Sequence, residues 1–159
     1  MSLNKDLLDQ FIKVTEYAAF GASMHIGKKD KIAADKGAVD QMREKLNKIN
    51  INGIVVIGEG EMDKAPMLYI GEKVGTKNGP YVDIALDPLE GTNFTANNLP
   101  DAFSVLAVAE KGNLLSAPDT YMDKIVIGTQ LPNNLLDLDN SVEKNINLLA
   151  DAKKKNKSE

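Results

Sequence analysis

The chain has 159 residues, of which 43% are hydrophobic, and its formal net charge is −4. This length is sufficient for a hydrophobic core, and a single domain is the default expectation. The acidic balance predicts no nucleic-acid partner, and no apolar run is long enough to span a membrane.

Helices and strands are predicted to alternate along the chain. Apolar residues between positions 7 and 19 recur near one face of a helix, and an apolar stripe over 39–49 predicts a second helix that starts at Asp35. Strands are expected near 54–57 and 82–87, where apolar and β-branched residues cluster. This alternation favours an α+β or α/β fold.

The carboxyl-terminal part is predicted to contain a hairpin, a further strand and a last helix. The strands lie at 103–109 and 114–115 around a turn at 110–113, and the further strand lies at 124–127. Asn140 or Ser141 is expected to cap a helix that runs to about Lys153. We expect one domain over 1–152, followed by a disordered basic tail over 153–159.

The segment 87–92, Asp-Pro-Leu-Glu-Gly-Thr, combines two carboxylates, a rigid turn, a backbone amide and a hydroxyl. We expect the preceding strand to end where the acids begin, with Pro88 and Gly91 forcing a turn and the Gly91 amide open to a phosphate oxygen. Carboxylate oxygens suit hard cations such as Mg²⁺ or Mn²⁺, which also carry phosphate. An ordinary turn whose acid caps the next helix remains open on this segment alone.

A second acidic turn follows the apolar run 54–57. Glu59 would lie at the carboxyl end of that strand, so two strand ends could converge on one cation. The alternative is a dinucleotide-binding loop, because a strand followed by Gly-x-Gly begins that motif. It is disfavoured because the third glycine is missing and because Glu59 and Glu61 would repel a pyrophosphate.

These motifs together closely resemble class II fructose-1,6-bisphosphatase, a member of the inositol-monophosphatase-like, metal-dependent sugar phosphatases. The resemblance runs from about Phe11 to about Leu149. It implies a layered mixed β-sheet flanked by helices, a sugar bisphosphate substrate and Mn²⁺ or Mg²⁺. The segments that carry it are 57–61, 65–75, 87–92 and 117–122.

The resemblance also implies a role for each site residue. It makes Asp35, Glu59, Asp87 and Glu90 metal ligands. Glu59 would in addition help to position the attacking water, Thr92 would orient that water, and Lys31 would lie beside the phosphate. Gly91, Thr92 and Tyr121 would contact the substrate.

Ordinary structural roles remain open for three of these residues. Asp35 could cap a helix, Lys31 could be solvated, and Tyr121 could be a packing residue. Lys36 stands where the family usually has glycine, which affects the expected geometry of Asp35.

The implied chemistry explains the choice of residue types. A phosphate monoester is dianionic and repels a nucleophile, whereas divalent cations neutralise that charge and lower the pKa of bound water. The chain has no Cys and a single His, His25, so cysteine-phosphatase chemistry is excluded and a phosphohistidine mechanism is disfavoured. The amino terminus lacks the apolar core of a signal peptide, so we expect a cytoplasmic protein with no membrane partner.

Members of the family continue beyond the position of Leu149 into a second domain, which we expect to be absent here. Three functions are compatible with the sequence. The chain is a fructose-1,6-bisphosphatase of gluconeogenesis or its metal-binding portion, a non-catalytic remnant that binds metal or phosphate, or a subunit that pairs with a separate second half. An apolar face left for the second domain would favour a homo-oligomer.

Overall fold

The computed structural model describes residues 5–59, 67–115 and 122–157. The chain divides into two compact units, Met1–Asp119 and Thr120–Glu159. The predicted boundaries, a domain over 1–152 and a tail over 153–159, stay a prediction. No helix in the described ranges is both long enough and apolar enough to cross a membrane.

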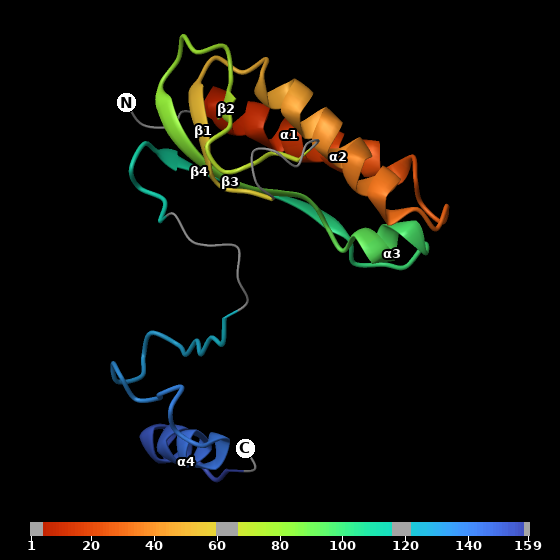
Figure 1. Ribbon diagram of the computed structural model, residues 1–159. Coiled ribbons are helices and arrows are strands. Elements are labelled where there is room, and N and C mark those ends of the chain that lie inside the picture. Colours follow the sequence, from red (N-terminus) through yellow and green to blue (C-terminus); the bar gives the residue numbers. More distant parts are fainter. Residues whose placement is uncertain (1–4, 60–66, 116–121, 158–159) are drawn as a thin grey trace. The chain divides into compact units, whose positions relative to one another are not determined.

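The first unit contains a four-stranded mixed sheet with the strand order β2-β1-β3-β4 (Figure 1). Its strands are β1 (Asn52–Ile57), β2 (Lys73–Val74), β3 (Tyr81–Glu90) and β4 (Phe103–Glu110). β1 pairs with β3 in parallel, whereas the β1–β2 and β3–β4 pairs are antiparallel. The expected mixed sheet with flanking helices is therefore confirmed.

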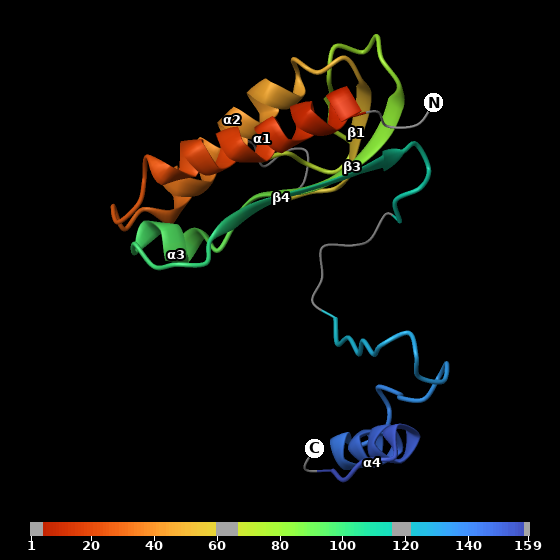
Figure 2. The same cartoon turned by 180° about the vertical axis from the view of Figure 1, so that it is seen from behind.

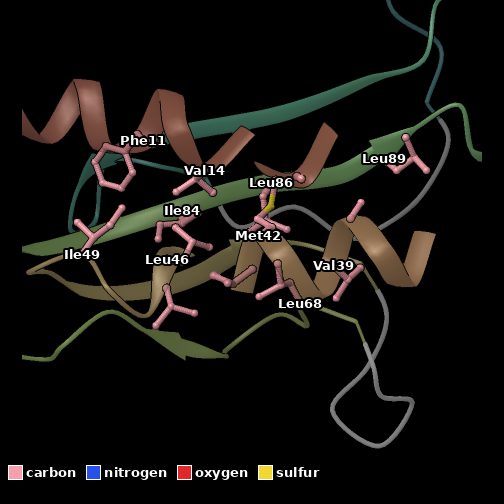
Figure 3. Close-up of a cluster of buried hydrophobic side chains, with 14 of the residues drawn as sticks. Phe11, Val14, Val39, Met42, Leu46, Ile49, Leu68, Ile84, Leu86 and Leu89 are labelled. Carbon is pink, nitrogen blue, oxygen red and sulfur yellow. The ribbon is translucent and has the colours of Figure 1, made fainter. Parts of the chain in front are cut away.

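Two helices, α1 (Lys5–Ser23) and α2 (Lys31–Leu46), pack side by side on one face of this sheet (Figures 1 and 2). They cross closely, because a Cβ added at Gly37 would lie 2.7 Å from the Gly21 carbonyl oxygen. Their inward side chains meet the alternate residues Val82, Ile84 and Leu86 of β3 to form one core (Figure 3).

The helix α2 begins earlier than predicted. It starts at Lys31, because the Asp30 carboxylate accepts a hydrogen bond from the Ala33 amide at 2.9 Å and caps the helix. Burial of Ala34 and Ala38 then requires a helix from this first turn. The expected start at Asp35, and the alternative that Asp35 is the cap, were both wrong.

The strand β3 does not end at the acids as predicted but continues through Pro88 to Glu90. Its register with β4 shifts between Asp87 and Glu90. Pro88 lies in this bulge, where its lack of a backbone N–H breaks no hydrogen bond of the sheet. The turn comes at Gly91, which has φ 85° and precedes the short helix α3 (Thr92–Ala96).

The predicted hairpin after β4 was also wrong. A turn does form at Lys111 and Gly112, but the Gly112 amide donates to Asp83 Oδ2 at 2.6 Å, which ties the turn back to β3. Residues 114–115 form no strand.

In the second unit, the expected strand at 124–127 is not formed, and Val126 is exposed there. The expected last helix is confirmed as α4 (Val142–Lys153), with Ser141 accepting a hydrogen bond from the Lys144 amide at 3.2 Å.

Candidate metal and phosphate site

The parallel pairing of β1 and β3 brings the two acidic turns to one edge of the sheet. Ile57 of β1 lies opposite Ala85 of β3, so both strands point their carboxyl ends the same way. Glu59 follows β1 directly and donates its backbone N–H to the Leu68 carbonyl at 3.2 Å. The two acidic turns therefore follow parallel neighbouring strands at the same edge of the sheet, and their convergence on one cation stays a prediction.

The bulge in β3 sets the positions of Asp87 and Glu90. The Leu89 amide donates to Asp87 Oδ1 at 3.0 Å, and the Ser104 hydroxyl of β4 donates to the Pro88 carbonyl at 2.7 Å. These two bonds fix the unpaired backbone of the bulge. Gly91 then turns in the left-handed conformation, which costs glycine least, and delivers Thr92 as the first residue of α3.

An open pocket of about 520 Å³ collects residues from three of these segments. Lys31 and Asp35 come from α2, Glu59 follows β1, and Thr92 begins α3. All four are residues that the sequence had marked as site candidates. Neither Asp87 nor Glu90 lines the pocket, but the Asp35 carboxylate lies close enough to Asp87 to act on its charge.

Sequence reasoning did not assign Lys36, Ile32 and Met67 to the site, although all three also line the pocket. Lys36 had been noted only as a departure from the family pattern. Its position beside Asp35 was the available signal, because neighbouring residues in one helical turn share an end of the helix. Its ammonium forms an ion pair with Asp40 one turn further along α2.

Burial and repulsion between neighbouring charges disfavour the ionised form of the carboxyl groups of the site. Burial raises the pKa of Asp35 above its usual value, and one of its oxygens, Oδ1, is buried and has no hydrogen-bond partner among the described residues. The pKa of Asp87 is raised to about 6, first by burial, then by a hydrogen bond to Glu90 and by the charges of Glu90 and Asp35.

This donor set suits a hard divalent cation, which would offset the crowded charge and supply the partner that Asp35 Oδ1 lacks in the described part of the chain. Within the described ranges, no three acidic or histidine side chains are arranged to enclose a cation as they stand. Tyr121, the remaining candidate, lies outside the described residues. The chemistry of the donors therefore fits a metal, and the ligand set stays a proposal.

Comparison with known proteins gives the family. The model of bacterial, glpX-encoded fructose-1,6-bisphosphatase matches residues 5–159. The chain belongs to the class II fructose-1,6-bisphosphatase family. The resemblance noted from the sequence is thereby confirmed.

Individual relatives match most of the chain. Fructose-1,6-bisphosphatase 1 class 2 of Escherichia coli K12 is 53% identical over 126 residues, which are 79% of this chain and 38% of the relative. The class 2 enzyme of Haemophilus influenzae is 47% identical over 93% of this chain and 44% of the relative.

A third relative carries a broader name. D-fructose 1,6-bisphosphatase class 2/sedoheptulose 1,7-bisphosphatase of Prochlorococcus marinus MIT 9301 is 44% identical over 94% of this chain and 44% of the relative. In each of these three relatives, the chain spans less than half of the protein's length.

Proposed function

We propose that this class II family chain provides the metal- and phosphate-binding part of a sugar bisphosphatase that hydrolyses the 1-phosphate of fructose 1,6-bisphosphate in gluconeogenesis. The observation that carries the proposal is the single pocket shared by Lys31, Asp35, Glu59 and Thr92. The name of the Prochlorococcus relative makes sedoheptulose 1,7-bisphosphate a second candidate substrate.

Asp35, Glu59, Asp87 and Glu90 would hold the divalent cation that the family implies, with Mn²⁺ and Mg²⁺ as the candidates. The cation supplies charge neutralisation of the phosphate and a lowered pKa for the attacking water.

Around it, the Glu59 carboxylate would accept the proton of that water, and the Thr92 hydroxyl would orient it. The Lys31 ammonium and the Gly91 amide would bind phosphate oxygens, and Tyr121 would contact the sugar.

Two features of the described residues support these roles. Lys31 makes no ion pair in the described part of the chain, so its charge is available to a phosphate at the pocket. Thr92 follows the left-handed turn at Gly91 and lines the same pocket as Glu59, as a shared water requires.

The test is phosphate release from fructose 1,6-bisphosphate by the purified chain with Mn²⁺, with Mg²⁺ and with EDTA. We expect weak, metal-dependent turnover that rises when the part of the Escherichia coli relative that this chain does not cover is added as a separate carboxyl-terminal fragment. Asp87→Asn should abolish it, whereas Asp9→Asn, the same change on the exposed side of α1, should leave it unchanged.

A folded chain that binds metal but releases no phosphate, with or without that fragment, would contradict the catalytic proposal and favour a non-catalytic remnant. Turnover only with the fragment would favour a subunit that pairs with a second half. The coverage of less than half of each relative is the observation behind that second candidate.

A further inference from the structure

A second pocket of about 280 Å³ lies at the amino ends of β1 and β3, the opposite ends of these strands from the acidic site. Three lysines line it, Lys73, Lys77 and Lys111, together with Asn52 and Tyr81. None of the described residues that line it is acidic. A local excess of positive charge is unexpected on a chain whose net charge is −4.

Lys77 is held in an unfavourable backbone conformation. Its φ is 68°, in the left-handed region that a side chain disfavours. Two bonds enforce it: the Lys77 amide donates to the Ile51 carbonyl at 2.9 Å, and the Asn52 side-chain amide donates to the Lys77 carbonyl at 2.7 Å. A strained residue fixed in this way is typical of a binding position.

Lys111 and Lys73 are anchored by the sheet. The Lys111 amide donates to the Tyr81 carbonyl at 3.2 Å, and its ammonium lies 5.3 Å from the centre of the Tyr81 ring. Lys73 lies opposite Ile54 in the β1–β2 ladder. The three lysines therefore come from separate segments whose backbones are held in place. This lowers the conformational entropy that is lost when a ligand binds.

We propose that this basic pocket, formed by Lys73, Lys77 and Lys111, binds a phosphate dianion. Three lysines that line one concave surface focus a positive field there, and such a field attracts an anion. In the described part of the chain, none of the three makes an ion pair. Lysine is a compact point charge that suits phosphate, and the volume fits a small ligand.

This site is independent of the proposed function, because its lining residues and those of the acidic pocket do not overlap. The ligand would be either free phosphate or the phosphate group of a small monoester. Both present the same charge and oxygens to the lysines.

The experiment is a titration of the full chain, in EDTA and at constant ionic strength, with inorganic phosphate and separately with glycerol 3-phosphate. Amide resonances are followed by NMR. We expect saturable shifts at Lys77, Tyr81 and Gly112 in at least one arm, and the tighter arm identifies the source of the phosphate. Non-saturating shifts spread over the surface would overturn the proposal.

Variants test the charges directly. Lys73→Gln and Lys111→Gln should each weaken binding about fivefold, the effect of losing one charge about 4 Å from the ligand when water screens the interaction. Lys77→Gly should also weaken it while relieving the left-handed strain, so a loss of binding there cannot be ascribed to unfolding. Lys13→Gln, the same loss of charge on the exposed side of α1, should not change it. Equal effects of all four changes would contradict a built site.

Discussion

Asp87 lies where the bulge of β3 brings it close to two other carboxyl groups, those of Glu90 and Asp35. Its pKa of about 6 in the folded chain is above the ordinary value of 3.8. The folded state therefore binds more protons than the unfolded state between these two values, and this residue's contribution to stability falls as the pH rises from about 4 to about 6.

We therefore expect Asp87→Asn to raise the melting temperature of the metal-free chain at pH 7 and to flatten its pH dependence between pH 4 and pH 6. The amide keeps the shape of the side chain and removes the charge that burial and Glu90 disfavour. Thermal melts in EDTA across this pH range measure both effects. A steeper pH dependence in the variant would show that Asp87 is not the group responsible.

Addition of Mn²⁺ or Mg²⁺ should stabilise the parent chain, because a cation would offset the crowded carboxylates. At a metal concentration a hundredfold above the dissociation constant, the gain is about 2.7 kcal/mol. Asp87→Asn should lose this gain, whereas Asp9→Asn should keep it. A melting temperature that stays constant through a millimolar titration of the parent chain would count against the proposed site.

Thr92 provides a second test at the scale of one side chain, carried out in a form with measurable turnover. Thr92→Ala should lower turnover by about a hundredfold or more if its hydroxyl orients the attacking water, and Thr92→Ser should be milder. Stabilisation by metal should persist in both variants. Full turnover in Thr92→Ala would show that the hydroxyl serves only as a turn or capping group and does not orient the water.

At the scale of elements, the sequence predicted α1, α2, α4 and the two central strands, because their apolar periodicity is strong, but it did not predict α3. It placed the start of α2 wrongly, because Asp30 and Asp35 are both plausible caps, and they are separated only by the bond from the Ala33 amide to Asp30 and by the burial of Ala34. It ended β3 too early, because proline usually stops a strand. The bulge and the Ser104 hydroxyl that allow Pro88 to stay depend on β4, which is distant in sequence.

The candidate site was predictable to a similar degree. Glu59 and the acids of 87–92 were visible because each group follows an apolar run, and the family resemblance added Asp35, Lys31 and a role for the Thr92 hydroxyl. The participation of Lys36 and Met67 depends on how α2 and the segment before β2 come together in space. No pattern of neighbouring residues in the sequence predicts that packing.

The close crossing of α1 and α2 gives a prediction about helix packing. Gly→Ala inside an exposed helix usually stabilises by about 0.5–1 kcal/mol. At Gly37 the added Cβ would lie 2.7 Å from the Gly21 carbonyl oxygen, so we expect Gly37→Ala to destabilise by about 1–3 kcal/mol in urea unfolding. Stabilisation instead would show that the helices separate at little cost.

Arg43 of α2 anchors the segment that precedes β2. Its Nε donates to Glu72 Oε1 at 2.7 Å, and its Nη2 donates to Glu72 Oε2 at 3.1 Å and to the Met67 carbonyl at 2.5 Å. Arg43→Lys should destabilise by about 1–3 kcal/mol, because lysine cannot reproduce the forked geometry of this partly buried pair.

The exposed pair of Lys48 and Glu44 is the matched control for Arg43. Lys48→Ala should change the free energy of unfolding by less than about 1 kcal/mol, because water screens that pair. Comparable losses in the Arg43 and Lys48 variants would contradict the role given to Arg43.

At the scale of the whole molecule, β4 forms an edge of the sheet in the described residues and carries exposed apolar side chains. Phe103 is 55% exposed and Val105 is 41% exposed. Exposed edge strands of this kind favour pairing between chains, so we expect concentration-dependent self-association.

Light scattering across a dilution series tests this expectation. Val105→Lys should shift the chain towards the monomer, because a charged side chain on an edge strand disfavours pairing with a strand of another chain. The same change at Val126, which is 91% exposed in the second unit, should have little effect. A chain that is monomeric at all concentrations would exclude an edge-driven assembly.

The bulge between Asp87 and Glu90 determines which face of the sheet each of the two acids occupies. In a regular strand, residues three apart point to opposite faces, yet here the Glu90 carboxyl group lies close enough to Asp87 to raise its pKa. The extra residue in the bulge turns the two side chains to the same face of the sheet. Gain or loss of one residue between them would turn one acid towards the other face, whereas another apolar residue in place of Leu89 would leave both where they are. We infer that this stretch tolerates changes of identity far better than changes of length, so insertions and deletions, more than substitutions, mark where the site would fail.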